Sequence, residues 1–214
     1  MTAKQLSRKQ KEKLRHRYHI IEAALTLFSQ KGYHDVSMRE IAKKSEFAIG
    51  TLYTYFKNKE ELYHALMICR AKRHHDLYKT ILEKKDEPLK LVYEYIAART
   101  KLFSDNTEGI RLYFAETSGI AYNIKASLNK ELRELYDEII KMLASVFEEG
   151  KKRNVFCDID SFYLATSLEG IINAFLFLWL ENPRKHPYDK NVSLIEKLFL
   201  KGAVHRESDL GQKS

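Results

Sequence analysis

The stretch Val36–Leu62, VSMREIAKKSEFAIGTLYTYFKNKEEL, determines how the N-terminal part of the chain folds. It contains two signals for the start of a helix. Ser37 and Glu40 form a capping box, in which the hydroxyl accepts from an N–H of the first turn and the carboxylate reaches back to the cap. Asn58 and Glu61 repeat the pattern with asparagine as the cap. The spacing predicts two short helices with a tight turn between them, and a further helix that starts at Asn58.

Between the two caps, the apolar residues are spaced for the small core of two short helices. The predicted core residues are Ile41, Ala42, Phe47, Leu52 and Phe56. The side chains left exposed are short or carry a hydroxyl, and none is acidic; they are Ala48, Ile49, Gly50, Thr51, Tyr53, Thr54 and Tyr55. Such a face can enter the major groove of DNA, touch base edges and donate hydrogen bonds to phosphate oxygens. The stretch is therefore predicted to be a helix-turn-helix, whose second helix reads DNA.

This stretch resembles the DNA-binding domain of the tetracycline-repressor (TetR/AcrR) family of bacterial transcriptional regulators. The string GTLYTYFKNKEEL, from Gly50 to Leu62, is similar to that family's signature at the end of the recognition helix and the start of the next helix. The similarity runs from about Tyr18 to Leu66, and includes the upstream string IIEAALTLFSQKGYHDVSMREIA. One feature departs from the pattern, because the turn usually carries a glycine and this chain has Ser45-Glu46-Phe47. Glu46 would then adopt a left-handed backbone at some cost in strain.

The resemblance implies an all-α fold of about nine helices. It implies a basic arm and a three-helix helix-turn-helix DNA-binding domain over residues 1–64, and a larger helical effector-binding and dimerisation domain over residues 65–214. The residues that it assigns to phosphates are Thr51, Tyr53, Tyr55, Lys59 and, at a helix N-terminus that favours anions, Ser37. The residues that it places nearest the bases are Arg39, Ala48, Ile49, Gly50 and Thr54.

The formal net charge of +8 is concentrated at the end of the chain that carries this motif. Residues 1–64 contain 13 Lys and Arg against 7 Asp and Glu, whereas residues 65–214 contain 24 against 22. The first 17 residues contain a single acid, Glu12, and their cations are Lys4, Arg8, Lys9, Lys11, Lys13, Arg15 and Arg17. A basic arm of this kind is expected to add phosphate or minor-groove contacts, while the alternative is a solubilising tail.

Composition limits the remaining classes of protein. A chain of 214 residues with 44% hydrophobic residues can bury a core, either as one domain or as a small domain joined to a larger one. Its charged start has no apolar run, so no signal peptide is predicted. The two cysteines, Cys69 and Cys157, form no CxxC or metal-ligand pattern, which favours the cytoplasm.

No catalytic or metal-binding motif stands out in the sequence. GxSxG, P-loop, HExxH and GxGxxG patterns are absent from it, so neither a catalytic residue nor a cofactor is predicted. The run His74-His75-Asp76 suggests a metal, but adjacent helical residues point about 100° apart and do not easily share an ion. His16 and His19 lie among cations, which disfavour a bound metal ion. No metal site is predicted.

The rest of the chain is predicted to be helices separated by breakers. The expected ranges are 11–30, 58–82, 88–104, 110–118, 124–152, 160–182 and 193–204, with Pro88 in a first turn and Asp158 or Asp160 as a cap. No segment shows the period-two alternation of a solvent-facing strand.

The stretch IINAFLFLWL, Ile171–Leu180, is apolar on every side and must be covered on every side. About ten residues are too few to cross a bilayer, so no membrane span is predicted. The resemblance implies that the last two helices pair with those of a second copy in a four-helix bundle, and small residues permit close approach. The expected interface residues are Ser167, Gly170, Ala174 and Leu198. A buried central helix in a monomer is the alternative.

The C-terminal part is rich in aromatic residues, as apolar ligand sites are. The candidate effector-pocket residues are Tyr93, Arg99, Phe103, Phe114, Tyr122, Phe147, Asn173 and Phe177. The existence of a pocket is implied by the resemblance, and aromatic residues at helical spacing also occur as plain core. A large apolar ligand, such as a fatty acyl chain or an aromatic drug, is the expected effector.

The function expected from these observations is a ligand-responsive transcriptional regulator. A homodimer would place one reading helix in each of two successive major grooves of a palindromic operator, and an effector would release it. Repression is expected because a dimer on a promoter blocks polymerase without further contacts. Two alternatives are a DNA-binding protein controlled by a protein partner, and a helical enzyme whose motif is a chance match.

Overall fold

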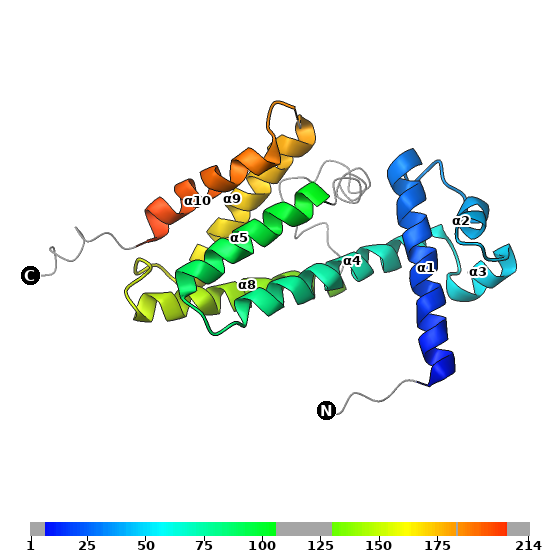
Figure 1. Cartoon of the computed structure of the whole chain (residues 1–214), viewed down its shortest axis with the longest axis horizontal. Helices are drawn as coiled ribbons and strands as arrows, with labels where there is room; N and C mark the ends of the chain where they lie inside the picture. Colours follow the sequence, from blue (N-terminus) through cyan, green and yellow to red (C-terminus); the bar gives the residue numbers. More distant parts are fainter. Residues whose placement is uncertain (1–6, 106–129, 183, 205–214) are drawn as a thin grey trace, which may run out of the picture. The chain divides into compact units, whose positions relative to one another are not determined.

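The structure is a computed structural model that describes residues 7–105, 130–182 and 184–204. The chain is all-α over these residues, as the sequence predicts, and no strand forms among them. Figure 1 shows the helices, which are α1 (Arg8–Lys31), α2 (Met38–Lys44), α3 (Ile49–Tyr55), α4 (Lys59–Leu82), α5 (Pro88–Asp105), α8 (Lys130–Lys152), α9 (Ser161–Glu181) and α10 (Tyr188–Ala203). The short helix predicted over 110–118 lies outside the described residues.

Side-chain caps supply partners for free N–H groups at the starts of α1, α2, α4 and α9, whereas α3 and α10 begin without one. The Asn58 side chain accepts from the Glu61 N–H at 2.8 Å at the start of α4, and Asp160 caps α9. Pro88 is the first residue of α5, as predicted. Two predicted starts are wrong: α1 begins three residues before Lys11, and α10 begins five residues before Ser193, directly after Pro187.

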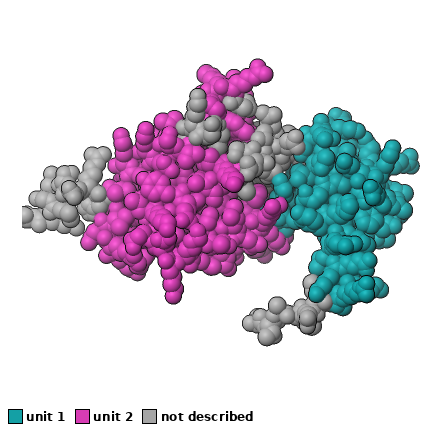
Figure 2. Space-filling model, in the orientation of Figure 1, with its two compact units in different colours: residues 1–70, 108–119 teal, residues 71–107, 120–214 magenta. Residues whose placement is uncertain are grey.

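The chain folds as two compact units (Figure 2). Within the described residues, the first unit comprises residues 7–70 and the second comprises the remainder. The division falls inside α4, six residues after the boundary predicted at residue 64. The core of the first unit combines α1, α2, α3 and the start of α4, and its buried residues include Ile20, Ala24, Phe28, Ile41, Leu52, Phe56 and Leu62.

The second unit packs α5, α8, α9 and α10 against one another. Its aromatic centre is Phe147, whose ring centroid lies 4.9 Å from that of Phe156 and 5.6 Å from that of Phe199. All three side chains are buried. A Cβ added to Gly150 would lie 2.3 Å from the Phe156 ring, so the backbone of α8 leaves room for this ring only because residue 150 has no side chain.

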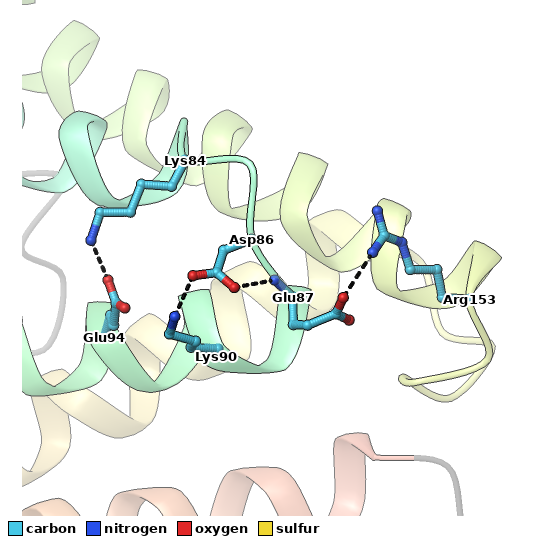
Figure 3. Close-up of polar contacts among 6 residues, drawn as sticks. All are labelled: Lys84, Asp86, Glu87, Lys90, Glu94 and Arg153. Carbon is cyan, nitrogen blue, oxygen red and sulfur yellow. Dashed lines mark hydrogen bonds and ion pairs between the residues drawn. The ribbon is translucent and has the colours of Figure 1, made fainter.

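The connection between α4 and α5 is held by charged side chains (Figure 3). Lys84 pairs with Glu94 at 2.5 Å, and Arg153, directly after α8, lies 3.5 Å from the Glu87 carboxylate. Asp86 accepts from the Glu87 N–H at 2.8 Å and pairs with Lys90. These contacts fix the chain reversal, while each exposed pair adds little stability by itself.

Helix α9 is longer than the ten-residue apolar run from which the sequence analysis excluded a membrane span. The apolar run continues into a helix of 21 residues, whose mean hydropathy reaches 1.4 over an 18-residue window. Length and composition alone therefore allow it to cross a membrane. Its packing gives the more specific assignment, because α9 contacts α5, α8 and α10 and buries Leu168, Ile172 and Leu176 against them. It is a core helix of the second unit.

Candidate nucleic-acid interface

Helix α2 begins with the predicted capping box. Ser37 Oγ accepts from the Glu40 N–H at 3.2 Å, and the Glu40 carboxylate accepts from the Ser37 N–H at 2.9 Å. Lys31 donates to the same carboxylate at 2.7 Å, and this bond followed by those from Ser37 lowers the pKa of Glu40 to about 2. Because the Ser37 hydroxyl also donates to Glu40, a phosphate at this helix start would compete with the cap.

The turn between α2 and α3 is closed by backbone and hydroxyl hydrogen bonds. Ser45 is buried, and its Oγ donates to the Ile41 carbonyl at 2.8 Å. The Phe47 N–H donates to the Ala42 carbonyl at 3.0 Å. Glu46 has a φ of 58°, which confirms the left-handed backbone predicted at this position of the turn. The exposed Glu46 thus carries the backbone strain of the turn.

Helix α3 is fastened to the core by Leu52, with Phe56 directly after it, and both side chains are fully buried. The residues that it and its N-cap expose are Ala48, Ile49, Gly50, Tyr53 and Thr54. The prediction of exposure is wrong for Thr51 and Tyr55, which are half-buried, since a helix of seven residues on a core can expose only part of its circumference. Thr54 donates its hydroxyl to the Thr51 carbonyl at 2.6 Å.

Tyr55 joins the end of α3 to α1. Its hydroxyl lies 3.2 Å from Nδ1 of His16, and its carbonyl accepts from Nη1 of Arg17 at 3.0 Å. The Arg17 guanidinium lies 4.2 Å from the centroid of the Phe56 ring, within the range of a cation–π contact. Tyr55 therefore orients α1 on the reading helix, in addition to the phosphate contact that the resemblance assigns to it.

Lys59 has a different position from the one expected of a phosphate ligand. Its ammonium donates to the carbonyls of Tyr33, Val36 and His34, at 2.8, 2.9 and 3.1 Å. An ammonium has three donors, and these bonds use all of them. Lys59 thus holds the loop before α2 in place. A phosphate could bind this ammonium only by displacing at least one of the three carbonyls.

An open hollow of about 650 Å³ lies beside α3. Five of the ten predicted DNA-binding residues line it, namely Ser37, Arg39, Ile49, Tyr53 and Lys59. Ala48, Gly50, Thr51, Thr54 and Tyr55 lie outside the lining. Arg39 is exposed, and no ion pair to it forms within the described part of the chain. The hollow therefore combines the exposed Arg39 with the hydroxyl-bearing Ser37 and Tyr53, and one acid, Asp35, also lines it.

The candidate effector residues of the second unit are only partly brought together. Nη2 of Arg99 on α5 donates to Glu169 of α9 at 2.8 Å and lies 3.3 Å from Oδ1 of Asn173. The Tyr95 hydroxyl donates to Glu169 at 2.6 Å. Burial and then the charge of Glu169 raise the pKa of Tyr136 to about 12. Arg99 and Asn173 thus belong to one buried polar cluster.

Sequence reasoning missed Glu169 and Tyr95 as members of this cluster. One signal was available, because Glu169 is the only charged residue between Asp160 and Glu181. A single carboxylate in so apolar a helix is buried with a partner or faces water, and the carboxylate of Glu169 is buried.

The other candidate pocket residues do not join this buried polar cluster. Tyr93 is 41% exposed on the surface of α5, and Phe147 is core. Phe177 is half-buried on α9. Phe114, Tyr122 and the side chain of Phe103 lie outside the described residues.

The residues predicted at a dimer interface are on the surface of the second unit. Ser167, Gly170 and Ala174 are exposed on α9, and Leu198 of α10 is 61% exposed. Phe162, Tyr163, Leu178 and Leu194 extend the same two helices with further exposed apolar side chains. Within the described ranges no three His, Cys, Asp or Glu residues gather as a metal site, and His75 instead lies 2.8 Å from Glu138.

The geometry defines a class of protein, a helix-turn-helix DNA-binding protein with a second, larger helical unit. Residues 20–66 match the sequence model described as bacterial regulatory proteins, tetR family. The chain is 27% identical over 193 residues to IcaR of Staphylococcus aureus, the HTH-type negative transcriptional regulator of the biofilm operon icaADBC, covering 85% of this chain and 97% of that protein. Over residues 20–66 the chain therefore has the DNA-binding domain of the tetR family, and along most of its length it is similar to transcriptional regulators.

Solved structures of regulators share the fold over most of the chain. A regulator from Saccharomonospora viridis in complex with choline has a TM-score of 0.73 at 22% identity, covering 89% of this chain and 98% of that one. The regulator FadR from Bacillus subtilis in complex with stearoyl-CoA has a TM-score of 0.64 at 22% identity, covering 86% and 98%. One of these ligands is a small cation and the other a long acyl thioester, so the shared fold does not determine ligand chemistry.

Proposed function

We propose that this regulator is a homodimeric repressor, which binds a two-fold symmetric operator and is released by a small, largely apolar effector held in its second unit. The observation that carries the proposal is the α3 surface. Ala48, Ile49 and Gly50 leave room for base edges, and Tyr53 lines the same hollow as the exposed Arg39. No acidic residue of α3 opposes a phosphate backbone.

The dimer is supported by the exposed face of the last two helices. Soluble surfaces seldom leave large apolar side chains in a row, and Leu178, Leu194 and Leu198 are each more than 40% exposed. A helix of seven residues reads only a few base pairs, so two copies on a two-fold axis would be needed to cover an operator. IcaR is named a negative transcriptional regulator, and we extend repression to this chain as part of the proposal.

The effector proposal rests on the buried cluster of Arg99, Glu169 and Tyr95. A buried ion pair contributes little net stability, since the cost of removing both charges from water offsets their attraction. A polar anchor for the head of an otherwise apolar ligand is a function that would account for its presence. The cytoplasm is the proposed compartment, because bacterial DNA lies there.

The experiment is a selection of binding sites from random duplex DNA by the full chain, at about 150 mM salt because phosphate contacts weaken as salt rises. Enrichment of a two-fold symmetric site is the expected result. Enrichment of one short half-site would contradict the dimeric arrangement, and binding without sequence preference would contradict the regulator as proposed.

A Gly50→Ala variant tests the proposed reading face without disturbing the fold. A Cβ on Gly50 meets nothing within 4 Å, so the fold accepts it and helix propensity rises by up to about 1 kcal/mol. Affinity for the selected site should nevertheless fall at least about fivefold, because the methyl occupies space against the bases. Unchanged affinity would remove Gly50 from the base-reading surface.

The effector is tested with two probes of opposite chemistry, choline and stearoyl-CoA. The acyl compound is expected to raise the melting temperature and to release the selected DNA, each ligand weakening the other by the same factor. A response to choline alone would contradict the proposed apolar effector. Release by neither probe, with release by a protein from the same cell, would favour control by a partner.

A further inference from the structure

The first two turns of α1, over residues 8–15, are exposed and extend beyond the core of the first unit (Figure 1). Its buried residues begin only at Ile20, twelve residues after the helix starts. A capping box fixes that start, because Ser7 Oγ accepts from the Gln10 N–H at 3.2 Å and Gln10 accepts from the Ser7 N–H at 2.8 Å. The basic segment is therefore helical from Arg8, three residues before the predicted start at Lys11.

The cations of this helical extension fall on two faces. At about 100° per residue, Lys9, Lys13 and Arg17 follow one another at intervals of four residues along one face. Arg8, Lys11 and Arg15 cluster on the opposite side of the helix. The acid of this segment, Glu12, lies nearest the second group. We call Lys9 and Lys13 the inner row, because they share the face of Arg17.

Arg17 ties the inner row to the reading helix. Its guanidinium bonds the carbonyl of Tyr55, the last residue of α3, and lies over the ring of Phe56. His16, one residue earlier, contacts the Tyr55 hydroxyl. Lys13 and Lys9 follow Arg17 at one and two further turns, roughly 6 and 12 Å along the helix axis. The row therefore continues outward from the end of the DNA-reading helix.

Both side chains of the inner row are available for a ligand. Lys9 and Lys13 are exposed, and within the described residues no ion pair engages either of them. A lone basic run on a helix is usually a solvated face. Here the run is anchored on the helix that reads DNA, and its Lys side chains are compact point charges suited to phosphate oxygens.

We propose that Lys9 and Lys13 form a second DNA contact, which neutralises backbone phosphates flanking the bases read by α3. This inference rests on the proposed DNA-binding function. Lysines on phosphates carry no base information, so the inner row raises affinity for all duplexes alike and leaves specificity to α3. The outer group, with Arg8, Lys11 and Arg15, faces away and contributes only to the general field.

The test compares two double variants that remove the same charge from opposite faces. Lys9→Ala/Lys13→Ala removes the inner row, and Lys11→Ala/Arg15→Ala is the charge-matched control, since all four residues are exposed. Affinity of the full chain for its selected site and for an unrelated duplex is measured by fluorescence anisotropy from about 50 to 300 mM salt, where phosphate contacts dominate the slope.

In the inner-row variant, the negative slope of the log association constant against log salt should become shallower by about 1.8, which corresponds to about 30-fold weaker binding at 150 mM. Both duplexes should lose the same factor, and the selected sequence should stay unchanged. Lys9→Arg/Lys13→Arg should restore the slope, which also excludes a folding defect.

Equal losses of DNA affinity in the two alanine variants would contradict a specific role of the inner row and would attribute the effect to net charge alone. An unchanged slope in the inner-row variant would overturn the contact. Either result leaves the proposed function intact as long as the wild-type chain still selects a symmetric site, so the failures of the two proposals are distinguishable.

Discussion

Among the glycines of the described residues, Gly150 is the one at which an added methyl group would meet other atoms. An added Cβ would lie 2.3 and 2.5 Å from two carbons of the Phe156 ring and 3.1 Å from the Cβ of Pro88. Phe156 is 1% exposed and cannot swing into solvent, and Pro88 begins α5 and is equally confined. The small residue is required by this contact and not by its backbone angles.

Gly150→Ala is expected to destabilise the fold by about 1–3 kcal/mol, the usual cost of overpacking a core. Urea unfolding of the full chain measures the change. The matched control is Gly202→Ala on α10, where a Cβ meets nothing within 4 Å and no loss is expected. A stable Gly150→Ala variant would mean that Phe156 packs differently from the arrangement described.

At the scale of the element, α2 depends on its cap for a defined start. The helix has only seven residues, too few to be stable alone. Glu40 accepts hydrogen bonds from Lys31 and Ser37, which lower its pKa from 4.5 to about 2. A carboxylate whose pKa is lower in the folded state stabilises the fold above its unfolded pKa, and that contribution disappears as the pH falls through the folded value.

Glu40→Gln should therefore lower the melting temperature at pH 6, since the amide cannot replace the charged bonds. The difference from the wild type should be constant above about pH 5, should shrink as the pH falls and should vanish only below the folded pKa of about 2. Thermal unfolding followed by circular dichroism across this range measures it. A difference that stays at its full size down to pH 2 would show that the carboxylate acts through its shape and not its charge.

Features set by neighbours in sequence could be predicted, and those set by distant partners could not. The caps at Ser37 and Asn58 follow from residues within four positions, and the left-handed Glu46 follows from the resemblance to a turn that usually carries glycine. The bonds from Lys59 to carbonyls 23 to 26 residues away depend on how α4 packs, which no local pattern encodes. The early start of α10 at Tyr188 was missed because the segment after Pro187 is polar and resembles a loop.

The functional surfaces follow the same division. The exposed surface of α3 was predictable in part, because Leu52 and Phe56 face the core and leave Tyr53 and Thr54 exposed, whereas Tyr55 between them is half-buried. The buried pair of Arg99 and Glu169 joins positions 70 residues apart. Periodicity assigns such residues to a helix but does not assign their partners.

For the whole molecule, the exposed leucines of α10 are expected to hold the proposed dimer together. Leu198→Glu places a charge where an apolar contact between two copies is expected, and burying it unpaired is costly. The variant should behave as a monomer of 25.2 kDa in sedimentation, where the wild type has twice that mass. Affinity for a symmetric operator should fall with it, because the two reading helices then bind independently.

Leu77→Glu is the control for this change, since Leu77 is 43% exposed on α4, outside the α9 and α10 face. It should remain a dimer with unchanged operator affinity. If both the Leu198→Glu and the Leu77→Glu variants are monomeric, general destabilisation is indicated. If both remain dimers, the interface does not include Leu198 of α10.

The bond between Arg99 and Glu169 also limits how this lineage can change over generations. The Glu169 side chain is 1% exposed and that of Arg99 14%, so losing either one strands the other's charge at a cost of about 3–5 kcal/mol. Replacing both by apolar residues is far less harmful. Descendants should therefore keep both residues or lose both, and a chain that has lost only one should carry a new partner nearby. The two positions act as one inherited character, although 69 residues separate them in the gene product.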